Sequence, residues 1–169
     1  MLFNSSTFLS KCFSEPCKVS IAPVTFSFAL FKYVTVDLYE PKNANVFDPL
    51  SVTNAKNVWH RGYPIQYVPD RHQVEYKGKT TRYVLMQADL WDGDPDIDAM
   101  ARLSLRPMYK LNVTAPYCST TIAPFNSQNT FISREVIPYY PIMPFIGRMD
   151  DIWGSFIAQY HFPDSLIFN

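Results

Sequence analysis

The sequence predicts an α/β domain of mostly short strands, two or three helices and long loops. Fourteen prolines against only five glycines argue against long regular elements, because each proline fixes its own φ and withdraws a backbone donor. Residues 19–37 are rich in β-branched and aromatic side chains, which favours strands. Two segments led by aspartates, at Asp94 and Asp150, carry the signals of helix starts.

The composition is that of one globular domain with a real core. The 169 residues are 47% hydrophobic and 18% charged, which is too apolar for a disordered chain. Fifteen basic and fifteen acidic residues cancel, so no overall field attracts nucleic acid or an anionic membrane. We therefore expect no nucleic-acid partner.

The cysteines and the longest apolar run exclude several further classes of protein. Cys12, Cys17 and Cys118 are odd in number and lack CxxC spacing, so reduced thiols in a cytoplasmic setting are expected. The apolar run at residues 21–36 is broken by Pro23 and is too short for a membrane span. We expect neither a transmembrane helix nor a secretion signal.

The first half of the chain is expected to contain strands. Residues 19–37 predict two short strands that end at Asp37, and a loop follows from Pro41 to about Asn57. Residues 83–88 form a nearly continuous apolar run after Lys77-Gly78-Lys79. We therefore predict a turn at Gly78 and a buried strand after it.

Two helices follow. Asp94 can cap the first, Pro95 suits its first position, and the helix should end near Ser104, before Pro107. Its expected apolar face consists of Ile97, Met100, Ala101 and Leu103. The second helix begins at Asp150-Asp151 and ends before Pro163. Its apolar residues at helical spacing are Ile152, Trp153, Phe156, Ile157 and Tyr160.

Arg61 is the first candidate for chemistry. It lies in Trp59-His60-Arg61-Gly62-Tyr63-Pro64, beside a glycine that lets a ligand approach the backbone. Its planar guanidinium suits bidentate contact with phosphate or carboxylate, and flanking aromatics can stack on a sugar or base. The alternative is a surface turn with buried aromatics and a solvated arginine.

Carboxylates dominate two further segments. Residues 89–98 hold five aspartates, which can bind a metal or accept hydrogen bonds from sugar hydroxyls; the alternative is helix capping plus a solvated acidic loop. Asp150-Asp151 follows Arg148 at a helix start. One of these two carboxylates can cap the helix while the other acts as general base, and the alternative is capping alone. The histidines His60, His72 and His161 lack the spacing of a metal pair.

These segments together resemble the reversibly glycosylated polypeptides, also known as UDP-arabinopyranose mutases, and the related STELLO-type glycosyltransferase-like proteins. Residues 59–64 are similar to an arginine-glycine-tyrosine-proline motif, and residues 147–153 to a glycine-arginine-x-aspartate-aspartate-x-tryptophan motif. Residues 89–98 and 125–135 are similar to the stretches that lie between those motifs. Order and approximate spacing agree over about residues 46–161.

The resemblance implies the carboxyl-terminal part of a GT-A-like fold. Residues 46–169 would form the acceptor and sugar side, and residues 1–45 a β-rich leader, the remnant of a nucleotide-binding half. The implied function is glycosyl transfer from a nucleotide sugar, in particular a UDP-sugar, to an unidentified acceptor. Asp150 or Asp151 would be the general base, and Arg61 would face the diphosphate or sugar. The implied substrate-binding residues are Trp59, Trp91, Asp94, Asp96, Asp98, Asn126, Arg148 and Trp153.

The sequence also departs from these families. They place adjacent aspartates, which bind manganese or magnesium, ahead of the arginine motif, whereas only Asp37 stands there in this chain. We therefore expect weak binding of metal and nucleotide sugar by a truncated chain, with an oligomer or partner supplying the missing half. Two other functions stay open: a mutase that interconverts sugar ring forms through Arg61, and a non-catalytic binding domain that has lost the metal site. A Golgi-associated location is the alternative that the families imply.

Overall fold

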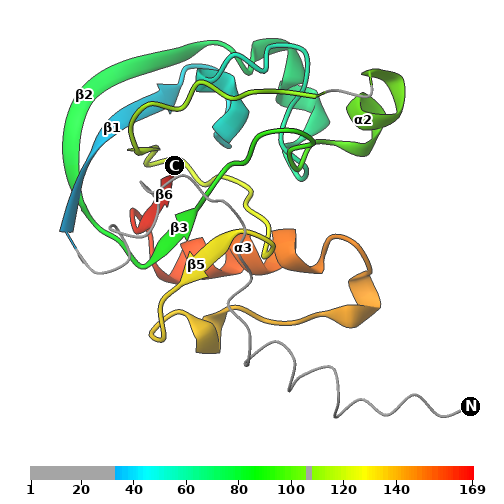
Figure 1. Ribbon diagram of the computed structural model, residues 1–169. Helices are drawn as coiled ribbons and strands as arrows, with labels where there is room; N and C mark the ends of the chain where they lie inside the picture. The colour runs from blue at the N-terminus through cyan, green and yellow to red at the C-terminus, as the bar shows by residue number, and fades with distance from the viewer. Residues whose placement is uncertain (1–32, 106–107) are drawn as a thin grey trace, which may run out of the picture.

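Six strands form one mixed sheet in the computed structural model, which describes residues 33–105 and 108–169 (Figure 1). The strands are β1 (Tyr33–Pro41), β2 (Val74–Tyr83), β3 (Met86–Ala88), β4 (Tyr117–Cys118), β5 (Thr130–Ile132) and β6 (Leu166–Phe168). Their order across the sheet is β2-β1-β4-β6-β3-β5. β1 runs parallel to β4 and β3 parallel to β6, and the remaining neighbours are antiparallel. The predicted α/β class is confirmed.

Helices are few and short in the described part of the chain. The α-helices are α2 (Ala99–Leu105) and α3 (Asp150–His161), and 3₁₀ helices span Pro49–Val52, Ile65–Asp70, Ile137–Tyr139 and Pro144–Ile146. Among the residues described, no helix has the length and apolarity that crossing a membrane requires.

The main core lies between the sheet and α3. Met86 of β3 and Phe168 of β6 pack in one buried cluster with Ala158 of α3. Phe125, from the loop before β5, belongs to the same cluster. Figure 1 shows α3 beside β3 and β5, with α2 at the far edge of the molecule. The burial of these apolar side chains fixes α3 against the sheet and so fixes where its first turn lies.

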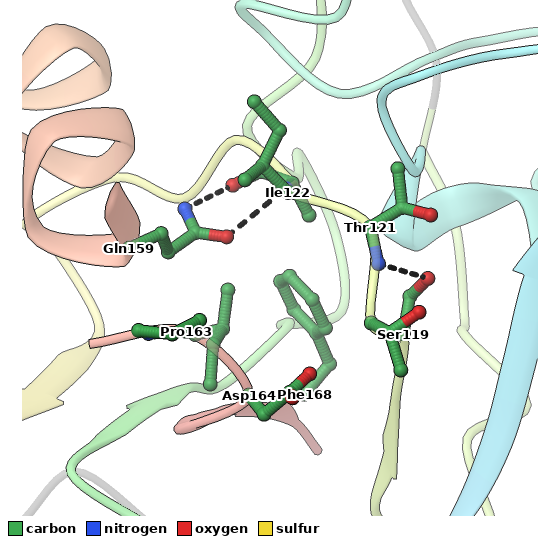
Figure 2. Close-up of a pocket in the computed structure, with 10 residues that line it drawn as sticks. Ser119, Thr121, Ile122, Gln159, Pro163, Asp164 and Phe168 are labelled. Atoms are coloured by element: carbon green, nitrogen blue, oxygen red, sulfur yellow. Dashed lines mark hydrogen bonds between the residues drawn. The ribbon is translucent and has the colours of Figure 1, made fainter. Parts of the chain in front are cut away.

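A buried glutamine ties α3 to the loop before β5. The Gln159 side chain donates to the carbonyl of Ala123 at 2.7 Å and accepts from its backbone N–H at 2.9 Å. Figure 2 shows Gln159 facing the segment that carries Ile122. This pair of bonds satisfies backbone groups that would otherwise be buried without partners. It holds the 119–126 segment along the helix.

The prediction for the strands around Asp37 and Gly78 was wrong in two respects. The first strand does not end at Asp37 but continues to Pro41, and the 19–32 part of the prediction lies outside the described residues. Gly78 is not in a turn: it lies inside β2, opposite Leu38, at a β-bulge with φ +97°. A bulge residue with positive φ requires glycine for the same steric reason that a turn does. The buried strand predicted at residues 83–88 is confirmed in part, since β3 covers Met86–Ala88 while Tyr83 is the last residue of β2.

The first helix begins later than predicted. α2 starts at Ala99, and Asp98, not Asp94, accepts a hydrogen bond from the Met100 N–H at 2.9 Å. Asp94 instead forms an ion pair with Arg102, at 3.2 Å. Ala101 is buried as predicted, but Met100 and Leu103 are 66% and 80% exposed because α2 packs at the edge of the molecule.

The start of α3 at Asp150 is confirmed, although neither aspartate is its capping residue. Met149 holds the N-cap position and has no side-chain cap bond. The predicted apolar face is partly right: Ile152 is buried, whereas Trp153 and Tyr160 are 52% and 82% exposed. The buried face uses small and polar side chains instead, including Gly154, Ser155 and Gln159.

Candidate functional site

Gly62 brings the arginine segment onto the first turns of α3. Its φ is +88°, and a Cβ added there would lie 2.4 Å from the Ile152 Cγ2 atom. Only glycine allows both this backbone conformation and this approach. The neighbouring residue Arg61 is thereby held beside the amino-terminal end of α3.

The acidic segment runs alongside the same stretch of chain. His60 and Ile97 form an isolated antiparallel bridge, and the Arg61 N–H donates to the Asp96 carbonyl at 3.2 Å. This pairing places the side chain of Asp96 next to that of Arg61. The arginine segment (residues 59–64) and the acidic segment (residues 89–98) are therefore adjacent. Arg61 also connects both of them to the third segment, the start of α3 at Asp150-Asp151.

The Arg61 guanidinium binds two carboxylates at once. Its Nε donates to the carboxylate of Asp96 at 2.9 and 3.0 Å, while Nη1 and Nη2 donate to that of Asp151 at 2.8 and 2.7 Å. Nη1 also donates to the Arg148 carbonyl. At least four of the five N–H groups are engaged, and the bidentate contact with Asp151 is the stronger geometry for an arginine and a carboxylate.

This cluster is largely withdrawn from water. The side chains of Arg61, Asp96 and Asp151 are 14%, 9% and 12% exposed. Burial raises the pKa of Asp151, but hydrogen bonds and positive charge from Arg61 outweigh burial and hold that pKa below its usual value. Burial lowers the pKa of Arg61, but its bonds to both carboxylates raise it above its usual value on balance. The side chains of Arg61 and Asp151 are therefore charged at neutral pH.

The two aspartates at the start of α3 have different surroundings. Asp151 accepts from the guanidinium of Arg61, from the Ser127 N–H at 3.3 Å and from the Ile152 N–H at 2.9 Å. Asp150 accepts from the backbone N–H of Asp151 at 2.9 Å and forms none of the ion pairs found among the described residues. Asp150 is thus the carboxylate with room for another hydrogen-bond donor.

An open pocket of about 320 Å³ lies against these aspartates. Its lining residues are Ser127, Ile132, Ile137, Tyr140, Pro141, Ile142, Asp150 and Asp151. The wall opposite α3 comes from the segment between β5 and α3. Tyr140 fixes that wall, because its hydroxyl donates to the Asp151 carbonyl at 3.0 Å and its ring stacks on Phe125.

The predicted substrate-binding residues of the first two segments, 59–64 and 89–98, make contacts within the fold. Trp59 packs, half-buried, against the cluster of Leu50, Val58 and Ile97. Trp91 Nε1 donates to the Asp94 carbonyl at 2.8 Å. Asp98 holds the first turn of α2, as described above, and Asp96 holds Arg61. Of these acidic side chains, only Asp96 joins the Arg61 cluster.

The remaining predicted residues are spread around the site. Asn126 is buried and accepts from the backbone N–H groups of Gln128 and Asn129, so it stabilises the turn before β5. Arg148 contributes its carbonyl to Arg61, and its side chain is exposed. Trp153 is exposed on α3 and is not among the residues that line the pocket.

The described residues do not fit the metal that the family resemblance implies. Asp37, its candidate ligand, accepts a hydrogen bond from the Tyr76 hydroxyl at 3.1 Å on the β1 and β2 strands. Across residues 33–105 and 108–169, no group of three or more His, Cys, Asp or Glu side chains could hold an ion. Manganese and magnesium prefer several oxygen ligands, and the described residues do not gather such a set.

Sequence reasoning missed the pocket wall. Tyr140 and the isoleucines at 137 and 142 lie in Ile137-Pro138-Tyr139-Tyr140-Pro141-Ile142, which has no helical or strand period. The one available signal was this alternation of proline with large apolar residues, just before the predicted helix start.

A comparison of the chain with protein-family models gives no match, and none of the curated proteins is significantly similar to it.

Proposed function

We propose that this chain is the acceptor-side part of a glycosyltransferase-like enzyme that uses a nucleotide sugar, with Asp150 as the general base. The observation that carries the proposal is the difference between the two aspartates at the start of α3. Arg61 holds Asp151, whereas Asp150 borders the pocket without an ion-pair partner among the described residues. The nature of the donor, a UDP-sugar, and the GT-A-like fold rest on the resemblance of the motifs around these residues.

In the proposed reaction, an acceptor hydroxyl lies in the pocket and donates a hydrogen bond to the Asp150 carboxylate. Its oxygen attacks C1 of the sugar and forms the new glycosidic bond. The bond from C1 to the phosphate oxygen breaks, and its electron pair leaves with the nucleoside diphosphate. The hydroxyl proton passes to Asp150. The products are the glycosylated acceptor, the nucleoside diphosphate and one proton, which Asp150 later releases to water.

Asp151 is less suited to be the base. Its oxygens already accept from Arg61, Ser127 and Ile152, and its pKa is held below the usual value. A general base works best when its pKa approaches the working pH, so a carboxylate stabilised in its charged form is a poor choice. We assign Asp151 and Arg61 the task of positioning the first turn of α3.

The geometry around Arg61 supports transfer over the mutase function. A mutase that becomes glycosylated at Arg61 needs a guanidinium nitrogen exposed to the sugar. Here the side chain is 14% exposed and binds two carboxylates and a carbonyl.

A transfer assay tests the proposal. The full chain is incubated with radiolabelled UDP-sugars at millimolar concentration, since we expect weak donor binding, together with Mn²⁺ and a set of alcohol and sugar acceptors. We expect labelled acceptor to form. Ring interconversion of the donor without transfer would support the mutase, and the absence of both reactions would support the non-catalytic binding domain. Either result would contradict the proposed function.

A further inference from the structure

The polar side chains that line the pocket beside Asp150 lie close together, because the Ser127 N–H donates to the carboxylate of Asp151, which follows Asp150 in the chain. Ser127, Asp150 and Asp151 supply them, and the other lining residues are isoleucines, a proline and the ring of Tyr140. Asp151 is paired with Arg61, so Asp150 is the lining carboxylate that has no ion-pair partner among the described residues. This distribution separates a hydrogen-bonding end from an apolar wall.

Tyr140 is not free to stack on a sugar ring. Its ring stacks on that of Phe125, with centroids 6.1 Å apart and planes 17° apart. It also lies against α3 at Gly154, where an added Cβ would be 3.0 Å from the Tyr140 Cζ atom. The hydroxyl is engaged with the Asp151 carbonyl. The ring and the hydroxyl of Tyr140 are therefore already engaged within the fold.

The apolar wall extends from the pocket to the molecular surface. Ile137 and Ile142, which line the pocket, are 59% and 81% exposed, and the neighbouring Phe145 is 85% exposed. Covering such exposed apolar side chains with an apolar ligand removes their surface from water, which gives a favourable free energy of binding. A free sugar would leave them uncovered and would find hydrogen-bond partners at only one end of the pocket.

From this arrangement we infer that the acceptor is a single amphipathic alcohol, with its hydroxyl at Asp150 and its apolar body along Ile137 and Ile142. The inference rests on the proposed function, because it names the acceptor of that transfer. Binding of the alcohol, however, is measurable without any donor. The carboxylate at the polar end also predicts discrimination by charge, since an anionic head group would meet Asp150.

Ligand-observed NMR titrations of the full chain with 1-octanol, octanoate and glucose test the inference. We expect 1-octanol to bind at least about tenfold more tightly than either competitor, because glucose lacks the apolar body and octanoate carries the repelled charge. Asp150→Asn should reduce the gap in affinity between octanol and octanoate. Equal binding of glucose and octanol, or an unchanged gap in the variant, would overturn the inference.

Two matched variants locate the binding. Ile142→Asp should weaken octanol binding by about tenfold, because a charge replaces part of the apolar wall. Ile65→Asp is the control: Ile65 is 71% exposed in the Ile65–Asp70 helix and does not line the pocket. Equal effects of both variants would show general surface adsorption and contradict the inference. Transfer to sugars without octanol binding would overturn only this inference. Octanol binding without any transfer would overturn the proposed function and the acceptor role, and would leave the pocket as a binding site for an amphipathic alcohol.

Discussion

Arg61 joins residues that lie 35 and 90 positions away from it in the sequence. Arginine is suited to joining two carboxylates because its planar group with five donors can bind one carboxylate through Nε and another through its two terminal nitrogens. Lysine carries the same charge but cannot reproduce both contacts. Because the partners are largely buried, loss of the arginine leaves carboxylates whose charge is uncompensated.

We predict that Arg61→Lys destabilises the fold by about 1–3 kcal/mol, because lysine keeps the charge but leaves some of the hydrogen bonds to the two buried carboxylates unmade. Urea unfolding followed by circular dichroism measures the change. Arg134→Ala is the control, because Arg134 is exposed and the change should cost less than about 0.5 kcal/mol. An Arg61→Lys variant as stable as the control would show that the cluster contributes nothing to the fold.

We predict that the stability of the fold depends on pH through the buried carboxyl of Asp48. Its Oδ1 accepts from the N–H groups of Leu50 and His60, while Oδ2 lies 3.7 Å from Arg71 Nε. Burial raises the pKa of Asp48 to about 6, and the hydrogen bonds and Arg71 only partly oppose it. The native carboxyl thus binds a proton more tightly than the unfolded chain does. Its protonation stabilises the fold as pH falls from about 7 to 4, and this contribution is lost as pH rises through 6.

The variant Asp48→Asn removes this titration and keeps an oxygen that can accept both N–H groups. The free energy of unfolding of the wild type minus that of the variant should increase by roughly 1–3 kcal/mol between pH 7.5 and 4.5. Other groups, including buried His60, titrate in both proteins and cancel in the difference. Denaturant titrations at several pH values measure it. A difference that stays flat, or that decreases toward acid pH, is the contrary outcome.

At the scale of elements, local signals predicted some parts of the fold and misled at others. Aspartates followed by spaced apolar residues identified the start of α3, and a continuous apolar run identified β3. β2 was missed because it is an edge strand, with polar side chains on both faces and a glycine at its bulge. The start of α2 was misplaced because several aspartates in succession can each cap a helix, and packing of Ile97 decided between them.

Gly62 is the residue through which the arginine segment and α3 approach each other. Gly62→Ala should destabilise the fold by about 2–4 kcal/mol, because backbone strain at positive φ adds to a clash with Ile152. Gly147→Ala is the matched control, since Gly147 also has positive φ but no atom lies within 4 Å of an added Cβ. Gly147→Ala should cost only the backbone strain, and so about 1–3 kcal/mol less than Gly62→Ala, which adds the clash. Thermal or urea unfolding compares the two, and equal losses would refute the role of the close approach.

At the scale of the whole molecule, the sequence indicated which segments carry charged groups but not how those groups pair. The resemblance motifs pointed to Arg61, Asp96 and Asp151, which the fold does bring together. That Arg61 binds Asp151 and leaves Asp150 beside a pocket depends on the contact at Gly62 and on the packing of α3, which are non-local. The pocket wall could not be predicted because its irregular, proline-rich segment has no period.

The central claim is that Asp151 serves the structure and Asp150 serves the chemistry. Asparagine variants of each test it most directly, because asparagine keeps the shape and one acceptor oxygen. The measurement is the rate of glycosyl transfer by each variant, compared with its thermal midpoint. Asp150→Asn should lose at least about a hundredfold in turnover with little change in stability. Asp151→Asn should lower the thermal midpoint, because it breaks the bidentate contact with Arg61. Full activity of Asp150→Asn would contradict the account.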